Sequence, residues 1–159
     1  MTTQKSPLHV DLSDFAEQAR ALGKSESWIN NGFRSLLKKA SLFGERAARE
    51  GAPRDTSALA RSIVSESSES SARVFTPLNY AMTVEEGRRP GAKMPPPEAL
   101  RGWARRHGFQ GSLFVLARAI ARRGIKGRFF MKAATQKVNQ KMPDWMRELF
   151  SDVRQDFER

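Results

Sequence analysis

A long stripe of apolar residues in the first third of the chain is the feature that most constrains its fold. Apolar residues recur at spacings of three and four between residues 28 and 47, which predicts one long helix with a buried face. Ser25 can cap its start, and Gly51-Ala52-Pro53 predicts its end because proline cannot continue a helix. The stripe indicates core packing or a subunit contact, and its members are Trp28, Ile29, Phe33, Leu36, Leu37, Ala40, Phe43, Gly44 and Ala47.

A shorter helix is predicted before it. Leu12, Phe15, Ala16, Ala19 and Leu22 share one helical face, with Asp11 or Ser13 as a cap and Gly23 as the end. The residues before this helix, 1–10, are expected to form a flexible N-terminus.

The middle of the chain favours β-structure. Residues 62–66 and 72–76 alternate, and the serine-rich stretch 67–71 between them predicts a hairpin turn. Pro77 ends the second run, and residues 80–85 predict a further strand.

Helices are expected again after an irregular basic loop at residues 87–97, where three consecutive prolines oppose regular structure. One helix begins at Pro97 and ends near Gly108. A second runs from a Ser112 cap to Gly124, with Leu113, Leu116, Ala117, Ile120 and Ala121 on its apolar face. A loop at 125–130 leads to the last helical region, in which Pro143 predicts a break or kink.

The predicted fold class is therefore α+β, with a long N-terminal helix and additional helices packed on a small antiparallel β-sheet. A chain of 159 residues suits a single domain, 1–159, with a core over 10–141 and a C-terminal helix over 142–159.

Residues that carry enzyme chemistry are scarce in this sequence. There is no cysteine, and the two histidines, His9 and His107, lie far apart without metal-ligand neighbours. Glu85 and Glu86 are the only adjacent carboxylates, and in a strand they would point to opposite faces. No phosphate-binding, nucleotide-binding or nucleophile-elbow motif is present, so we expect no enzyme, no cofactor and no metal site.

Membrane insertion and secretion are not expected either. No run approaches 18 apolar residues, and the first 15 residues lack the apolar region of a signal peptide.

Positive charge is concentrated in one stretch. The net charge is +11, and residues 91–141 hold 12 basic side chains and one acidic side chain. This clustering favours a negative partner, either nucleic acid or an acidic protein surface, although a solvated basic face would give the same count.

Three segments, in this order, carry a resemblance to a known family. They are residues 52–63 (APRDTSALARSI), residues 80–88 (YAMTVEEGR) and residues 124–134 (GIKGRFFMKAA). They resemble the "P-x-D-T-G-x-L-x-x-S-I", "Y-A-x-x-[VH]-E-x-G" and "R-P-F-[ML]-x-x-A" motifs of the neck, minor-tail and tail-completion proteins of tailed bacteriophages, which include the lambda tail-completion protein. The resemblance covers roughly residues 10–140.

Two positions depart from the family pattern. Ser57 stands where the family has glycine, and since serine does not easily take a positive φ, we expect a helix-capping turn there. Phe129 stands where the family has proline, which removes a fixed φ but keeps an aromatic anchor.

The resemblance implies structural roles for the motif residues. Asp55 and Thr56 are expected to cap backbone N–H groups, Tyr80 to lie at the edge of the core, and Gly87 to let the chain leave a strand. Phe129 and Phe130 are expected to alternate, one against the sheet and one near a neighbour, with core packing favoured for both. The remaining motif residues are Leu59, Ile63, Glu85, Gly124 and Gly127.

The resemblance also implies a function in assembly. Copies would form a homo-oligomeric ring, a hexamer or alternatively a 12-mer, at the head–tail junction or tail end of a virion after assembly in the host cytoplasm. Such a ring would join the capsid connector to the tail through other phage neck and tail proteins, with passing DNA as an open further contact. The candidate interface or channel residues are Arg88, Arg89, Lys93, Arg118, Arg122, Arg123 and Arg128.

Three alternatives stay open. A tail terminator protein has the same size and mixed architecture. A nucleic-acid-binding protein outside a virion would use the basic stretch and its interleaved aromatics, although their spacing favours the core. A phage-derived toxin or nuclease is disfavoured by the missing site chemistry.

Overall fold

The computed structural model describes residues 8–11 and 26–157, with side chains described over 31–152. The helix predicted over residues 12–22 lies outside the described residues. The chain divides into two compact units, and each is described by itself. Unit 1 comprises Met1–Leu78 and Phe130–Arg159, and unit 2 comprises Asn79–Phe129. This division does not test whether the units unfold together, so a single domain stays a prediction.

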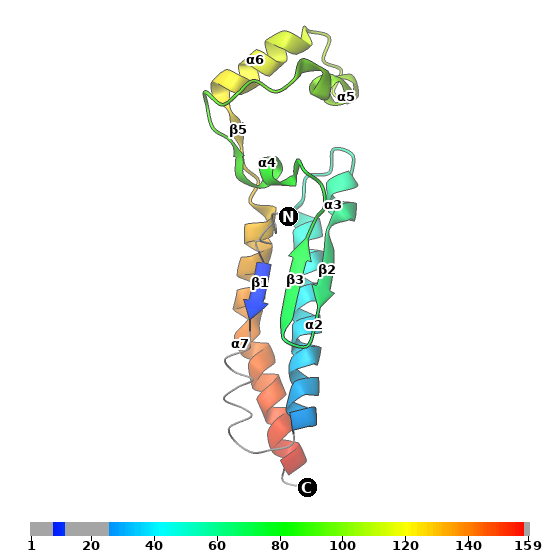
Figure 1. The fold of residues 1–159 in the computed structure, drawn as a ribbon, viewed down its shortest axis with the longest axis vertical. Helices are drawn as coiled ribbons and strands as arrows, with labels where there is room; N and C mark the ends of the chain where they lie inside the picture. The colour runs from blue at the N-terminus through cyan, green and yellow to red at the C-terminus, as the bar shows by residue number, and fades with distance from the viewer. Residues whose placement is uncertain (1–7, 12–25, 158–159) are drawn as a thin grey trace. The chain divides into compact units, whose positions relative to one another are not determined.

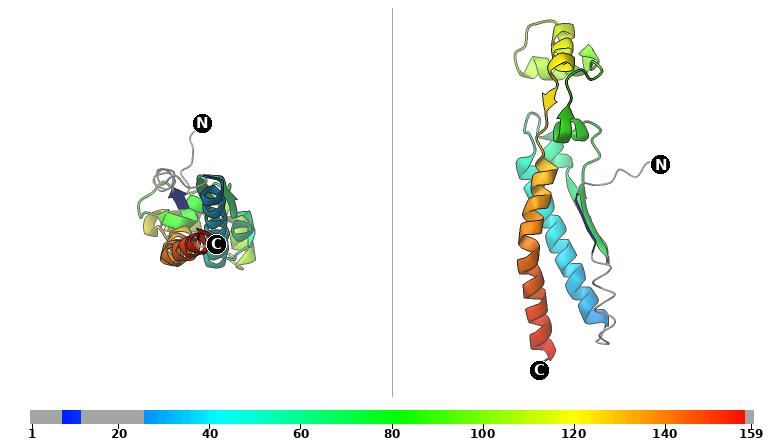
Figure 2. Two further views of the ribbon diagram at one scale, coloured as in Figure 1. Left: turned by 90° about the horizontal axis from the view of Figure 1, so that it is seen from below. Right: turned by 90° about the vertical axis from the view of Figure 1, so that its left-hand side faces the viewer.

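Two long helices form the frame of unit 1. Helix α2 (Glu26–Gly51) and helix α7 (Phe130–Phe157) lie side by side (Figures 1 and 2). The long N-terminal helix predicted from the apolar stripe is confirmed, including its end at Gly51. The interior between the elements of unit 1 is filled by the buried stripe of α2 together with residues of α7, namely Phe33, Leu36, Leu37, Ala40, Ala47, Phe130, Met131, Ala134, Val138 and Trp145.

A three-stranded antiparallel sheet covers these helices. Its order is β1-β3-β2, with β1 at Leu8–Asp11, β2 at Val64–Ser67 and β3 at Ser71–Phe75. Strands β2 and β3 contact α2, and β1 contacts α7. The hairpin of β2 and β3 is confirmed, and with it the α+β fold class, because helices and a small antiparallel sheet form one layered unit.

Side chains alternate along the central strand β3 as the sheet predicts. Ala72 and Val74 are buried, whereas Arg73 between them is exposed and pairs with Glu66 directly opposite on β2. Strand β1 was not predicted: its residues 8–10 belong to the stretch expected to be flexible. Leu8-His9-Val10-Asp11 does alternate between apolar and polar residues, but a run of four residues is a weak signal by itself, and the pairing with β3 fixes the strand.

Of the break or kink predicted at Pro143, the break is wrong, because α7 continues through the proline, and a kink stays a prediction. Proline removes one helical hydrogen bond and costs about 3 kcal/mol in a helix interior. Val138 and Trp145 are buried on either side of Pro143, so packing of both flanks against unit 1 holds the helix together.

The turn before helix α3 (Ala58–Ser62) corrects a second expectation. Ser57 takes φ +55° and ψ +4°, the left-handed conformation, and its side chain makes no capping hydrogen bond. The family glycine would have this conformation without strain, so the position keeps the glycine geometry despite its serine. Cap formation instead falls to Thr56, whose Oγ1 accepts a hydrogen bond from the Ala58 N–H at 3.3 Å.

Replacing Ser57 with glycine should therefore stabilise the protein. Relief of the left-handed serine outweighs the greater entropy of glycine in the unfolded chain, and the expected gain is about 0.5–1 kcal/mol. Chemical denaturation followed by circular dichroism measures it. Ser62→Gly is the contrasting change, because the Ser62 hydroxyl bonds the Leu59 carbonyl and Thr76, and it should destabilise. A destabilised Ser57→Gly variant would show that the serine hydroxyl matters instead.

Unit 2 consists of short elements. In order they are α4 (Ala81–Glu86), β4 (Gly87–Arg88), the 3-10 helix η1 (Pro97–Leu100), α5 (Arg101–Arg106), α6 (Leu113–Arg123) and β5 (Ile125–Lys126). The helices predicted from Pro97 and from Ser112 are confirmed, but the predicted Ser112 cap is wrong, because its side chain makes no capping hydrogen bond. The stretch predicted as a loop at 125–130 begins with β5, which pairs antiparallel with β4 at the start of the predicted basic loop.

The strand predicted over residues 80–85 is wrong, since α4 occupies it. Six residues are too few to form a stable helix alone. The Val84 and Glu85 carbonyls, which the helix itself leaves without partners, accept hydrogen bonds from the Arg128 and Phe129 N–H groups at 2.9 and 3.1 Å. A distant segment thus completes the helix end, which a local pattern cannot reveal.

Candidate interaction surface

The pairing of β4 with β5 brings two separate basic segments together in unit 2. Arg88 lies opposite Ile125, and Gly87 lies opposite Lys126. The Gly91 N–H donates to the Ala121 carbonyl at 2.8 Å, so the start of the basic loop also lies against the end of α6. Residues more than 30 positions apart in sequence are thereby brought close together on the surface of unit 2, although Arg88 and Lys126 belong to successive pairs of the ribbon and point to opposite faces of it.

We call this surface the basic cluster. It is formed by Arg88, Arg89, Arg122, Arg123, Lys126 and Arg128. Arg88 is half-buried and donates to the Lys93 carbonyl, and the other five side chains are exposed. Within the part of the chain that the structure describes, those five side chains make no ion pair and no hydrogen bond.

Charge in unit 2 is poorly balanced. The unit holds 11 basic and three acidic side chains. Among the acidic ones Glu98 pairs with Arg101, Glu85 is buried, and only Glu86 is exposed beside the cluster. The surface therefore keeps a strong positive potential that only a partner or solvent ions can neutralise.

Two close backbone approaches hold the cluster in place. A Cβ on Gly87 would lie 2.1 Å from the Ile125 carbonyl oxygen, and one on Gly124 would lie 2.3 Å from the Arg88 carbonyl oxygen. The family glycine at Gly127 lies equally close, because its Cβ would be 2.5 Å from the Glu85 carbonyl oxygen. These motif glycines therefore serve close packing of the β4–β5 ribbon rather than departure from a strand.

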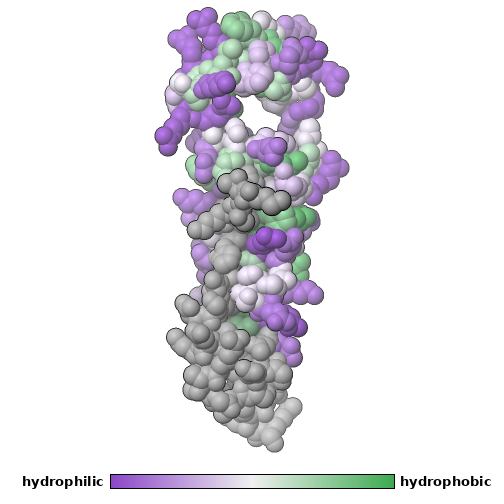
Figure 3. Space-filling view, viewed as in Figure 1, coloured by the Kyte–Doolittle hydropathy of each residue, from purple (hydrophilic) through white to green (hydrophobic). Residues whose placement is uncertain are grey.

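Large apolar side chains are exposed on unit 2. Helix α6 presents Phe114 and Val115, with 53% and 61% of their surface exposed, on the face that also carries Arg118 and Arg122. In Figure 3 strongly hydrophilic and hydrophobic residues lie next to one another over this unit. The other exposed apolar side chains of unit 2 are Tyr80, Met82, Met94, Trp103, Phe109, Ile125 and Phe129.

The interior of unit 2 is correspondingly small. Its buried apolar residues, within the described chain, are Ala81, Ala104 and Ala117. The predicted apolar face of α6 is the face that is turned inward, since Ala117 on it is buried and Leu113, Leu116 and Ile120 are half-buried. Trp103 stacks on His107, with ring centroids 4.5 Å apart, and stays 40% exposed.

The predicted motif residues are divided between structural and exposed positions. Leu59, Ile63 and Phe130 are buried in unit 1, as expected of packing residues. Core packing is wrong for Phe129, which is 47% exposed, although the expectation that one of the pair lies outside the core is confirmed. Tyr80 is also exposed, at the start of α4.

The predicted interface residues are exposed, apart from the half-buried Arg88. Arg118, Arg122 and Arg123 lie outside the core, as expected for a charged helix face. Lys93 is exposed and lies next to Arg88 through its carbonyl. Lys126 was not predicted as an interface residue. Its position two residues before Arg128 could have indicated it, but the segment was predicted to be a loop.

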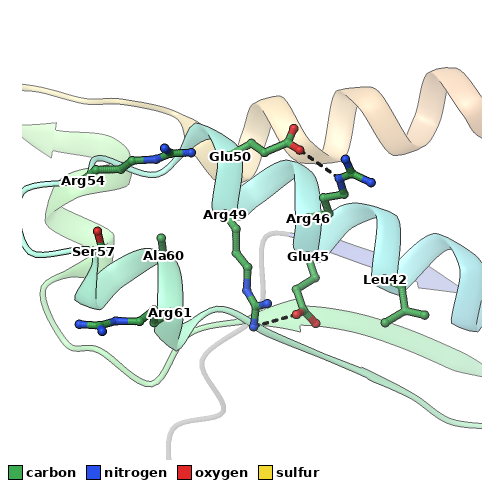
Figure 4. Close-up of a pocket in the computed structure, with 9 residues that line it drawn as sticks. All are labelled: Leu42, Glu45, Arg46, Arg49, Glu50, Arg54, Ser57, Ala60 and Arg61. Carbon is green, nitrogen blue, oxygen red and sulfur yellow. Dashed lines mark hydrogen bonds and ion pairs between the residues drawn. The ribbon is translucent and has the colours of Figure 1, made fainter.

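Unit 1 carries a pocket of about 630 Å³ between α2 and α3, shown in Figure 4. Four arginines and two glutamates are among its lining residues, but the charges largely satisfy one another. Arg46 pairs with Glu50 at 3.1 Å, and Arg49 pairs with Glu45 at 2.8 Å and bonds the Ile63 carbonyl. Arg49 thus links α2 to the α3–β2 connection, whereas the Arg46–Glu50 pair lies within α2. The pocket offers no nucleophile with a base.

Site chemistry of other kinds is not found in the described residues. They contain no group of three or more histidine, aspartate or glutamate side chains that could hold a metal ion, and no helix among them is long and apolar enough to cross a membrane. Comparison of the chain with family models, curated proteins and solved structures finds no match.

Proposed function

We propose that this chain is a structural virion protein of a tailed bacteriophage that forms a ring at the head–tail junction or tail end and joins the capsid connector to the tail. It acts by surface complementarity, without turnover. A tail terminator ring and a neck ring are both compatible with this proposal.

The observation that carries the proposal is that unit 2 exposes its large apolar side chains and buries mainly small ones. A unit of 51 residues whose buried apolar side chains are all alanines, and which exposes nine larger apolar side chains, cannot derive much stability from its own core. So many large exposed apolar side chains on one small unit favour a contact with another protein. Unit 2 is therefore the surface through which copies, or neighbouring phage proteins, pack.

The motif geometry supports the same proposal. The second and third segments of the family resemblance lie against each other through the β4–β5 pairing and the hydrogen bonds from Arg128 and Phe129. The first segment keeps a left-handed residue, Ser57, where the family has glycine. Segments that resemble a family in sequence and also fit together in space are less easily explained by chance.

Charge restricts how such a ring can close. Two copies of unit 2 repel each other because each has a large excess of basic side chains. A ring needs a heterologous contact, in which unit 2 meets a different patch of the next copy. The C-terminal half of α7 carries acidic side chains at four-residue spacing, Asp144, Glu148 and Asp152, of which Asp144 pairs with Arg147 and Glu148 pairs with Lys39.

A double change on α6 tests the proposal. Phe114→Ser with Val115→Ser removes the most exposed apolar pair and should convert the assembled protein to a monomer. Loss of two such contacts at an interface centre weakens association by roughly 100-fold or more. Light scattering after size-exclusion chromatography measures the mass, and electron microscopy of negatively stained protein shows whether rings form.

Leu42→Ser is the matched control, because Leu42 on α2 has the same exposed fraction, 53%, as Phe114. It should leave the assembly intact. A wild-type protein that stays monomeric at high concentration, and is absent from purified phage particles, would overturn the proposed function.

The second candidate is a nucleic-acid-binding protein that acts outside a virion. One observation favours it: Trp103, Phe109, Phe114 and Phe129 are exposed, although their spacing had favoured the core. This candidate predicts a monomer that is absent from particles, whereas the ring proposal predicts the reverse.

A further inference from the structure

We infer that the basic cluster of unit 2 is a binding site for the phosphate backbone of double-stranded DNA, without preference for sequence. The contact lies within one copy of the chain, so it does not depend on ring formation.

The first argument is convergence. Folding gathers six cations from two segments onto the β4–β5 ribbon and the end of α6, while the three acidic side chains of the unit leave only Glu86 exposed beside them. Mutual repulsion among these cations lowers stability, and five of their side chains gain no compensating ion pair within the described chain. A polyanion supplies that compensation, and duplex DNA presents one charge for about every 1.7 Å of its axis.

The second argument is the choice of side chain and support. Four of the five exposed members are arginines, whose forked donors suit phosphate oxygens. Close backbone packing at Gly87 and Gly124 holds the ribbon that carries Lys126 and lies next to the four arginines, so the backbone there needs little ordering on binding.

The third argument separates duplex from single-stranded nucleic acid. Single strands are bound by aromatic rings beside the cations, on which bases stack. Trp103 is already stacked on His107. Phe114 lies eight residues before Arg122, or about 12 Å along α6. Phe129 is the one exposed ring directly next to a member of the cluster, Arg128, whereas closely spaced cations without a row of rings among them suit contact with the phosphate backbone.

The test uses the full chain and a fluorescently labelled duplex of mixed sequence, about 30 base pairs long, with binding followed by anisotropy from about 50 to 200 mM salt. A variant with Arg89, Arg122, Arg123 and Lys126 all changed to Gln should bind about tenfold more weakly or worse at the lower salt. Its plot of log affinity against log salt should be flatter by roughly 3 to 4 units, because each lost phosphate contact removes about 0.9.

The matched control changes Lys38, Arg54, Lys137 and Lys141 of unit 1 to Gln. These four side chains are also exposed, and the net charge falls equally. If the control loses as much affinity and slope as the cluster variant, overall charge explains the binding and the site is refuted.

Two competitors decide the chemical class. Unlabelled duplex should displace the probe, whereas a single strand of equal length and poly-glutamate should compete at least tenfold less well. Equal competition by the single strand refutes the duplex, and equal competition by poly-glutamate identifies an acidic protein as the partner instead. Circular dichroism of the cluster variant must match the wild type, and Arg89→Lys with Arg122→Lys and Arg123→Lys should retain most of the salt slope.

Discussion

Gly87→Ala is expected to abolish the order of unit 2 while unit 1 stays folded. Gly87 has φ +80° and ψ −161°, a region that is essentially restricted to glycine. An added Cβ would lie 2.1 Å from the Ile125 carbonyl oxygen and 2.5 Å from the Gly127 nitrogen, and both are backbone atoms that cannot move aside. The combined cost is about 3 kcal/mol or more, which is a large loss for a unit with so small an interior.

Hydrogen exchange by mass spectrometry measures this effect unit by unit. Amides of α4 and the β4–β5 ribbon should lose protection, whereas those of α2 and α7 should keep it. Gly91→Ala is the matched control, because Gly91 has nearly the same φ, +79°, but nothing lies within 4 Å of its added Cβ. It should cost only about 1 kcal/mol. Equal protection in the Gly87 variant and the wild type would show that the ribbon does not hold unit 2 together.

Phe130→Ala should destabilise unit 1 by about 3–5 kcal/mol, the usual cost of truncating a fully buried phenylalanine. Phe130 begins α7, is 2% exposed and lies against Gly51 at the end of α2. Its loss opens a cavity where both long helices meet. For a chain of this size the midpoint of thermal unfolding should fall by about 10 °C.

The neighbouring residue gives the control for this change. Phe129 is exposed and has φ +51°, so Phe129→Ala should change stability by less than about 0.5 kcal/mol. Phe129→Gly should be neutral or stabilising because glycine relieves the positive φ. A Phe129→Ala variant as unstable as Phe130→Ala would mean that Phe129 is packed, contrary to its exposure.

The positive φ of Phe129 also explains a departure from the family pattern. The resembled motif has proline there, and proline fixes φ near −65°, so the conformation seen at Phe129 would be closed to it. The third motif therefore keeps its buried aromatic residue, Phe130, but the backbone before it takes a left-handed conformation that the family proline could not adopt.

Strong periodic patterns predicted most of the frame from sequence. The stripe of α2, the β2–β3 hairpin and the two helices after Pro97 were recognised because each is specified by residues within its own span. Elements that depend on distant partners were missed. Strand β1 exists through its pairing with β3, and α4 is completed by hydrogen bonds from Arg128 and Phe129.

The candidate surface was predicted residue by residue but not as a site. Spacing identified Arg118 and Arg122 as one helix face, yet it could not show that the β4–β5 pairing brings Arg88 opposite Ile125, just after the end of α6. The exposed aromatics were misjudged for a related reason. An apolar residue at helical spacing is normally buried, and its exposure here depends on how little structure covers it.

The β4–β5 ribbon has a consequence for how such chains diversify. The chain enters unit 2 just before α4 and leaves it at Phe129. The Phe129 N–H donates a hydrogen bond to the Glu85 carbonyl at the end of α4, so the two ends of the unit lie close together. The segment between Arg88 and Ile125 is an insertion whose two ends are held together, because Arg88 and Ile125 pair in the β4–β5 ribbon. Such an insertion can be shortened, lengthened or exchanged without altering the register of the sheet or the pairing of α2 with α7. Under the proposed function, replacement of this segment would change the partner, while the α2–α7 scaffold would stay the same.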